Sequence, residues 1–128
     1  MNTKLIMTLT AVLMAIIGLS LTFAPDQVAL ALGMDNSSAN RLILQLLGAA
    51  YYGFAIFNWM AKGSIIGGIY NRPLATGNFA HFLVAGLALG KAAFGRPQLP
   101  LVLLIVAGCY VILACVFGII FSRHPEKV

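Results

Sequence analysis

Four apolar stretches occupy most of this chain, and the only charged residue inside them is Lys91. They cover residues 5–23, 42–60, 75–94 and 100–121. A lysine, arginine or aspartate at the centre of a membrane helix costs about 2.5–3.5 kcal/mol to insert, so stretches without them enter lipid readily. About 20 helical residues cross the hydrocarbon core. The sequence therefore predicts an all-α integral membrane protein, a four-helix bundle forming a single transmembrane domain over residues 1–128.

Composition and charge indicate the same class of protein. Hydrophobic residues make up 61% of the chain and charged residues only 9%, whereas soluble domains contain roughly 25% charged residues. The net charge of +5 is spread singly over the ends of the apolar stretches, a pattern that sets membrane orientation. We therefore expect the lipid bilayer as a partner and no nucleic acid.

The distribution of lysine and arginine predicts how the chain crosses the membrane. An even number of spans puts both termini on one side, together with the connection between the second and third spans. That side carries five basic residues: Lys4, Lys62, Arg72, Arg123 and Lys127. The other side carries three basic residues and two acids: Arg41, Lys91, Arg96, Asp26 and Asp35. The positive-inside rule thus favours a cytoplasmic location for both termini.

A cleaved signal peptide over residues 1–24 is the alternative to an uncleaved first span. Its apolar run of about 19 residues exceeds the 7–15 of a signal-peptide core, and a proline would follow the cleavage point directly. We therefore favour the uncleaved helix.

A break is predicted after the first span, because Pro25 cannot continue a helix but suits the first turn of a new one. Residues 28–32 then form a short apolar run closed by Gly33, which we interpret as a short helix in the outer membrane interface. Residues 35–40 are rich in side chains that cap helix starts, so the second span should begin at about residues 38–41.

The connection between the second and third spans, residues 61–77, is the least regular part of the sequence. Residues 65–70 fit either a short interfacial turn or an extension of the second helix. Residues 71–73 predict a turn, because the residue before a proline avoids helical geometry. Pro100 suits the first turn of the fourth helix.

Helix packing in lipid depends on small residues that let backbones approach closely. Gly86 and Gly90 on the third span have the spacing that favours such contacts, and Ala49 and Gly53 on the second span have a looser version of it. These four residues either pack the helices of one bundle or form the face of a dimer.

Polar side chains at membrane depth are the candidates for ligand binding, since they are costly in hydrocarbon and normally face the protein interior. Arg41, Gln45 and Tyr52 share one stripe of the second helix. Asn78 and His81 share a face of the third helix, and Asn58 and Tyr70 approach from the same membrane side. His81 is then either a proton-transfer or ligand-binding group, or a structural histidine hydrogen-bonded to a neighbouring helix.

Several activities lack the residues that they need. The spans contain no carboxylate for proton-coupled export, no histidine pair for haem, no Cys-x-x-Cys motif and no glycine-rich phosphate loop. Cys109 and Cys115 are six residues apart and point away from one another on a helix, so we expect neither a disulfide nor a metal site. No cofactor is evident, and the sequence favours a non-enzymatic role over catalysis.

Three functions stay open at this point. The first is a structural or accessory bundle that associates with itself or with a larger membrane complex. The second is small-molecule binding or transport through the polar residues near the cytoplasmic face. The third, a quinone-linked redox accessory subunit, depends on family analogy.

That analogy comes from residues around the first break. Helix one ending in Phe23-Ala24-Pro25, a short segment over residues 28–33, and Arg41 opening a second helix with Gly48 together resemble the small four-helix bacterial membrane proteins of the DoxX-like superfamily. The resemblance implies a four-helix bundle in the cytoplasmic membrane of a bacterium. Some members of that superfamily are linked to quinone-connected sulfur oxidation. It transfers no catalytic residue to this chain.

Overall fold

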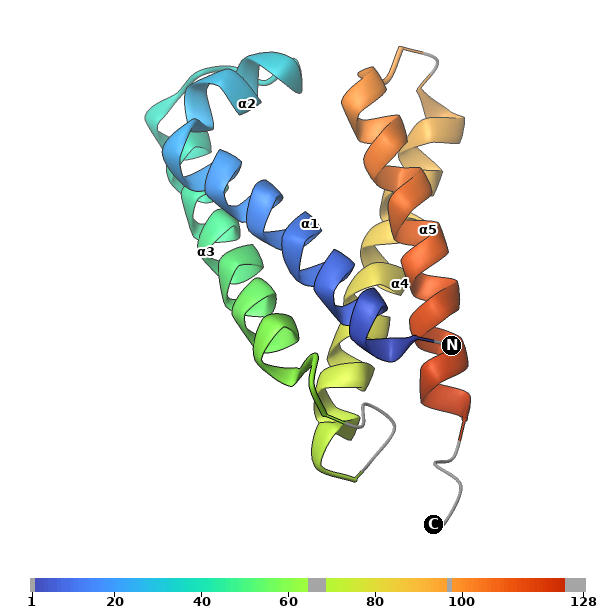
Figure 1. Ribbon diagram of the computed structural model, residues 1–128. Coiled ribbons are helices and arrows are strands. Elements are labelled where there is room, and N and C mark those ends of the chain that lie inside the picture. The colour runs from blue at the N-terminus through green and yellow to red at the C-terminus, as the bar shows by residue number, and fades with distance from the viewer. Residues whose placement is uncertain (1, 65–68, 97, 124–128) are drawn as a thin grey trace. The chain divides into compact units, whose positions relative to one another are not determined.

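The computed structural model describes residues 2–64, 69–96 and 98–123, and these residues form helices (Figure 1). The elements are α1 (Thr3–Phe23), α2 (Pro25–Ala31), α3 (Ser38–Ala61), the 3₁₀ turn η1 (Ile69–Asn71), α4 (Arg72–Gly95) and α5 (Leu101–Ser122). By length and composition, α1, α3, α4 and α5 can each cross a membrane, and the chain is a multi-pass membrane protein. The predicted all-α class is confirmed, as is the short helix after the first span.

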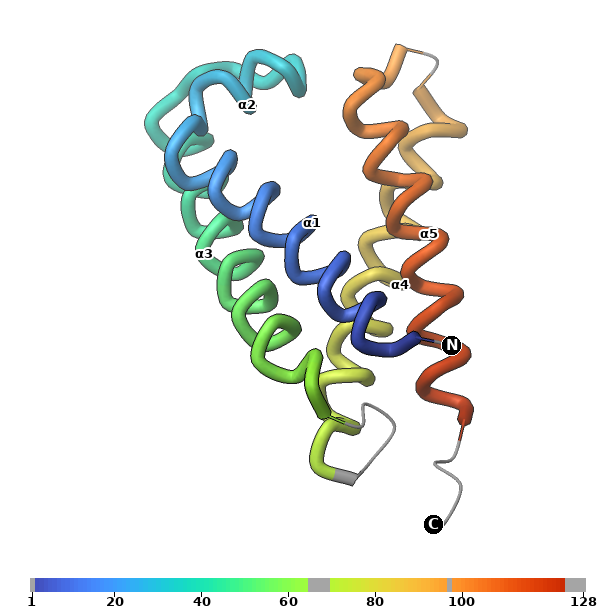
Figure 2. The backbone as a smooth tube through the Cα atoms, viewed as in Figure 1, coloured from blue at the N-terminus to red at the C-terminus, as the bar shows by residue number. Residues whose placement is uncertain are grey.

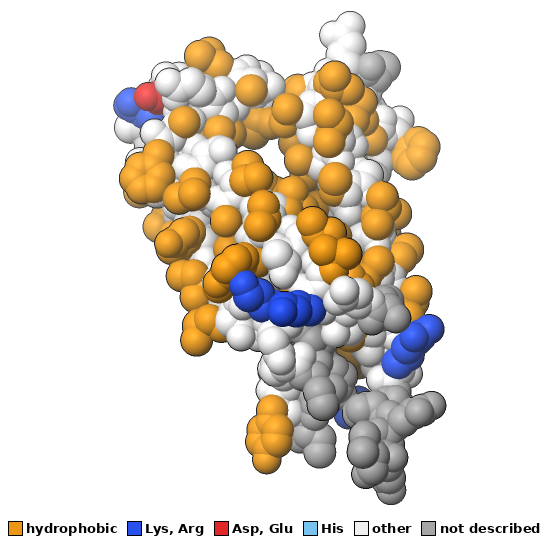
Figure 3. All heavy atoms as spheres, in the orientation of Figure 1, with side chains coloured by type: hydrophobic (Ala, Val, Ile, Leu, Met, Phe, Trp, Pro, Cys, Tyr) orange, Lys and Arg blue, Asp and Glu red, His pale blue; other side chains and the backbone are white. Residues whose placement is uncertain are grey.

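The chain divides into two compact units, Met1–Gly63 and Ser64–Val128. In the first, α1 and α3 run antiparallel and pack along one another, and α2 lies across one end of the pair (Figure 2). In the second, α4 packs along α5. On the visible face, hydrophobic side chains are spread along the long helices, whereas lysine and arginine side chains lie toward helix ends (Figure 3). This distribution is the one that lipid around the helices and water at their ends require.

Two glycines set the closest approach of α1 and α3. A Cβ atom on Gly18 would lie 2.9 Å from both the Gly48 carbonyl oxygen and the Tyr52 amide nitrogen. A Cβ atom on Gly48 would lie 2.5 Å from Thr22 Oγ1 and 2.9 Å from the Gly18 carbonyl oxygen. Because lipid gives apolar helices little reason to associate, this backbone contact supplies the dispersion energy that holds them together.

The packing residues predicted on α3 are displaced from this contact. Ala49 is exposed, and a Cβ atom on Gly53 would meet none of the described residues within 4 Å. The contact uses Gly48 instead, one residue before the predicted position. The spacing of small residues identifies a helix that can pack closely, but it does not say which face points inward.

Proline and glycine delimit α2 as predicted, although the helix begins at Pro25 rather than at residue 28. Buried Ala29 packs with Leu21 of α1 and Leu44 of α3, which holds α2 against the pair. Gly33 has φ +67°, and the Met34 amide donates to the Ala29 carbonyl oxygen at 2.8 Å. This is the hydrogen bond of a Schellman motif, which ends a helix at a left-handed glycine.

Replacing Gly33 by alanine is expected to destabilise the protein by about 1–2 kcal/mol, because a Cβ atom strains the left-handed conformation even though no neighbour lies within 4 Å. Unfolding in SDS, followed by the fluorescence of Trp59, the single tryptophan, measures the effect. Gly63→Ala is the control, since Gly63 also has open space around it but no positive φ. Equal effects of the two substitutions would contradict the strain argument.

The second span begins where the capping residues predict. Ser37 is the N-cap of α3, and its Oγ accepts a hydrogen bond from the Asn40 amide at 3.2 Å. The side chain of Asn40 donates to the Asp35 carbonyl oxygen at 2.9 Å, which ties the connection to the first turn. The first bond satisfies a backbone amide that a helix start leaves unpaired, and the second pairs the carbonyl oxygen of Asp35.

The connection after α3 differs in part from the prediction. Helix α3 ends at Ala61, so residues 62–64 do not extend it, and residues 65–68 lie outside the described part of the chain. The turn predicted at residues 71–73 is wrong beyond Asn71, because α4 already begins at Arg72 with Pro73 in its first turn. A proline is tolerated there since the first amides of a helix have no partner within it. At the next connection, Pro100 is the N-cap of α5 rather than its first helical residue.

The core of the second unit is aromatic. Phe82 of α4 is fully buried. Its ring packs edge-on against the Tyr110 ring of α5, with 5.0 Å between the ring centroids, and stacks with the Phe117 ring, with 5.7 Å between the centroids. Gly86 faces Tyr110 at an ordinary van der Waals distance, with a Cβ atom there 3.7 Å from Tyr110 Cβ. At Gly90, by contrast, a Cβ atom would meet nothing within 4 Å. Of the predicted pair, Gly86 thus lies in the contact between α4 and α5, and Gly90 lies outside it.

Candidate functional site

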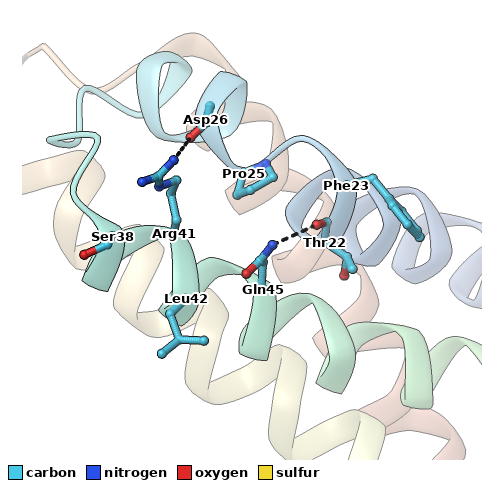
Figure 4. A pocket seen from close by; sticks show the side chains of 8 residues that line it. All are labelled: Thr22, Phe23, Pro25, Asp26, Ser38, Arg41, Leu42 and Gln45. Carbon is cyan, nitrogen blue, oxygen red and sulfur yellow. Dashed lines mark hydrogen bonds and ion pairs between the residues drawn. The ribbon is translucent and has the colours of Figure 1, made fainter.

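An open depression of about 510 Å³ lies at the end of the first unit where α1, α2 and α3 meet (Figure 4). Eight residues line it: Thr22, Phe23, Pro25, Asp26, Ser38, Arg41, Leu42 and Gln45. We call this the Arg41 depression. Its volume falls within the roughly 300–1,000 Å³ typical of small-molecule sites.

An ion pair stands at the edge of the depression. Arg41 Nη1 lies 3.6 Å from Asp26 Oδ1, and both side chains are about half exposed, at 45% and 46%. Pro25 produces this pair, because it starts a new helix directly after α1 and so brings Asp26, in the first turn of α2, opposite the first turns of α3 (Figure 4). A carboxylate also suits the first turn of a helix, where the helix dipole is positive.

The two groups hold one another loosely. A charge-assisted hydrogen bond between a guanidinium and a carboxylate is usually about 2.7–2.9 Å long and often bidentate, whereas this single contact is 3.6 Å. Asp26 Oδ1 is itself buried and has no hydrogen-bond partner among the described residues, so the exposed surface of this side chain lies elsewhere on it. Half-exposed pairs of this kind contribute about 0–1 kcal/mol to stability. The pair is therefore available to a ligand at little cost to the fold.

Gln45 lies one turn beyond Arg41 on the same side of α3, as predicted. Its Nε2 donates to the Thr22 carbonyl oxygen at 3.5 Å, a long hydrogen bond that bridges α3 to the end of α1 (Figure 4). Tyr52, the third residue of the predicted stripe, does not line the depression and is half exposed. Two of the predicted candidates, Arg41 and Gln45, thus line the depression. Asp26 also lines it and is not among the predicted residues, although its position directly after Pro25 was an available signal.

The first unit also contains a buried amide. Asn58 has no exposed surface, and its Nδ2 donates to the Phe54 carbonyl oxygen at 2.8 Å and lies 3.9 Å from Met14 Sδ of α1. Thr10 of α1 is buried as well, and its hydroxyl has no hydrogen-bond partner within the residues that the structure describes.

The second unit holds the remaining predicted polar residues. Asn78 is fully buried on α4, and His81 is partly buried one turn further along the same helix. His81 Nε2 and the Tyr110 hydroxyl share a hydrogen bond of 3.3 Å between α4 and α5, in which either atom can donate. Tyr70 is 97% exposed. Of the four predicted residues, Asn58 belongs to the first unit, and Tyr70, Asn78 and His81 belong to the second.

The hydrogen bond of His81 is the one expected of a structural histidine, and its role toward a ligand stays a prediction. Tyr110 was not among the predicted residues, although the sequence offered a signal, because it carries the only hydroxyl within residues 101–121. Over the described residues, no three histidine, cysteine or acidic side chains are grouped so that they could hold a metal ion.

Comparison of the chain with protein-family models, curated proteins and solved structures gives no match. The likeness to the DoxX-like superfamily therefore stays a resemblance in sequence pattern. What the chain can do has to be argued from its own residues.

Proposed function

We propose that this protein is a non-enzymatic structural or accessory protein of a bacterial cytoplasmic membrane, with both termini in the cytoplasm, and that it associates with itself or with a larger membrane complex. The single observation that carries the proposal is a glycine on the outer face of α3. Such a glycine lets a neighbouring membrane helix approach the backbone of α3 closely.

Gly53 lies on the side of α3 away from the Gly48 contact, five residues further along the helix, a rotation of about 140°. Among the residues that the structure describes, none lies within 4 Å of a Cβ atom built on it. Around it, Leu46 and Phe57 are 64% and 59% exposed, and Ala49 is exposed too. Small residues between larger apolar ones are the pattern that lets another membrane helix approach closely.

A second face of this kind lies on α4. A Cβ atom built on Gly90 would likewise meet none of the described residues within 4 Å. The neighbouring side chains of Leu87 and Phe94 are 67% and 96% exposed. Gly86 lies in the contact between α4 and α5, whereas Gly90 lies outside that contact. Both faces are apolar, so association through them depends on shape and backbone approach rather than on charge.

Replacing Gly53 or Gly90 by leucine is expected to reduce self-association, or the yield of a co-purified membrane complex, by about tenfold for the face that is used, because the added side chain blocks backbone approach. Single-molecule photobleaching in lipid nanodiscs counts the subunits, and native mass spectrometry identifies a partner. Ala88→Leu is the control: Ala88 is exposed on α4 and points about 160° away from Gly90.

Two results would overturn the proposal. One is an unchanged assembly in both glycine variants. The other is a wild-type protein that is monomeric in lipid and brings no other membrane protein with it. SDS unfolding of each variant, followed by Trp59 fluorescence and circular dichroism, separates loss of association from loss of fold.

A further inference from the structure

The Arg41 depression has the chemistry of a lipid headgroup site. We propose that it binds the headgroup of a zwitterionic phospholipid with a primary amine, of the phosphatidylethanolamine class. Arg41 would bind the phosphate, and Asp26 would accept hydrogen bonds from the ammonium group. The proposal is independent of the assembly argued above and concerns a different surface.

Its position in the fold is the first support. The depression lies where α1 ends at Phe23 and α3 begins at Ser38, which is where both spans reach the edge of the hydrocarbon. Arg41 is the fourth residue of α3, so it lies only about 4–5 Å along the helix from its start. The connection between α2 and α3 is polar, with Asp35, Asn36 and Ser37. These features place the ion pair at the level of lipid headgroups.

The charges are the second support. The depression contains one cationic and one anionic side chain, so it carries no net charge to attract a simple anion or cation. A phosphate alone would approach Arg41 against the nearby Asp26 carboxylate. A phosphate with an ammonium group on a two-carbon linker instead satisfies both side chains. The 3.6 Å separation is too long for a hydrogen bond, and the Asp26 side chain is 46% exposed even though its Oδ1 is buried, so its exposed part can bind a new partner.

The neighbouring surface is the third support. Phe23 and Leu42 both line the depression, and they are 80% and 56% exposed. In a bilayer these exposed side chains, which line the same depression as the charged pair, face acyl chains. Gln45 adds an amide that can donate to a phosphate oxygen, since its present hydrogen bond to Thr22 is 3.5 Å long. A molecule with a charged head and apolar tails thus matches both parts of the site.

Hydrogen bonding predicts which headgroup is preferred. A primary ammonium group has three N–H donors for the Asp26 carboxylate, whereas the quaternary ammonium of phosphatidylcholine has none. Phosphatidylglycerol has no cation and places a net negative charge beside Asp26. We therefore expect phosphatidylethanolamine to bind about tenfold more tightly than either, the difference that one charge-assisted hydrogen bond makes.

Native mass spectrometry of the full chain tests this preference. The detergent-solubilised protein is titrated in turn with phosphatidylethanolamine, phosphatidylcholine and phosphatidylglycerol of identical acyl chains. Asp26→Asn is expected to abolish the preference for phosphatidylethanolamine, and Arg41→Gln to weaken the binding of all three lipids. Asp26→Glu retains the carboxylate and should retain the preference, which separates a loss of charge from a loss of fold. Arg96→Gln, which removes an exposed arginine at the end of α4, is the matched control.

Three outcomes would overturn the proposal. The first is equal binding of the three lipids to the wild-type protein. The second is a preference that survives in Asp26→Asn. The third is displacement of the lipid by free phosphoethanolamine at a comparable concentration, which would make the ligand a soluble molecule rather than a lipid. Loss of the preference in Asp26→Asn, with its retention in Asp26→Glu and Arg96→Gln, supports it.

Discussion

Replacing Gly48 by leucine is expected to separate α1 from α3 and to lower the free energy of unfolding by about 3 kcal/mol, the upper end of the usual effect of overpacking. The reason is the backbone contact at this position. A Cβ atom would already lie 2.9 Å from the Gly18 carbonyl oxygen, which cannot move without its helix. Thr22 Oγ1, at 2.5 Å, could turn away, but the carbonyl could not. Unfolding in SDS, followed by the fluorescence of Trp59 on α3, measures the loss.

Gly53→Ala is the control for this experiment, since it also adds a Cβ atom to a glycine of α3 but into open space. It should leave the stability of the monomer within about 0.5 kcal/mol of wild type. A Gly48→Leu protein as stable as Gly53→Ala would contradict the close approach of α1 and α3.

Replacing Phe82 by alanine is expected to have a similarly large effect on the second unit, a loss of about 3 kcal/mol. The ring has no exposed surface and contacts Tyr110 and Phe117 of α5, so its removal leaves a cavity between the two helices. The expected loss lies at the low end for Phe→Ala because membrane helices unfold into lipid rather than water. Labelling of the partly buried Cys109 on α5 by a membrane-permeant maleimide, in a Cys115→Ser background, follows the separation of α4 and α5 during SDS titration.

Phe94→Ala is the matched control, because Phe94 lies on the same helix and is 96% exposed. Its removal should change the stability by less than about 0.5 kcal/mol. Equal losses for Phe82→Ala and Phe94→Ala would mean that α4 does not bury Phe82 against α5.

The sequence predicted the helices well because the features that define them are local. Apolar runs without charge define the spans, and Pro25 defines the break. Ser37 caps α3 through a hydrogen bond from the amide of Asn40, only three residues later in the sequence. The errors are also local. Pro73 was interpreted as part of a turn, although a proline in the first turn of a helix fits equally well.

The contacts between helices were harder to predict, since they depend on how each helix is rotated. On α4, Gly86 lies against Tyr110 at an ordinary van der Waals distance, whereas a Cβ atom on Gly90, one turn later, would meet none of the described residues within 4 Å. On α3, Gly48 occupies the contact for which Ala49 and Gly53 were expected. In an apolar helix every face is hydrophobic, so no polar stripe shows which side is buried.

The candidate site was partly predictable for a related reason. Arg41 and Gln45 share a helix, and their spacing alone puts them side by side. Asp26 is 15 positions earlier in the sequence, and only the turn at Pro25 brings it to Arg41. Likewise, the bond between His81 and Tyr110 joins residues 29 apart on different helices. Pairings of this kind follow from tertiary structure, which local spacing does not encode.

The division into two units, each made of antiparallel neighbours in sequence, has a consequence for biosynthesis. Within each unit the two long helices contact one another, so the contacts inside the first hairpin can form before the second hairpin leaves the ribosome. Chains emerge at about 5–20 residues per second, and domains generally fold as units from the N-terminus. Assembly of this protein can thus proceed hairpin by hairpin, because α1 contacts α3, which is the next span to be synthesised.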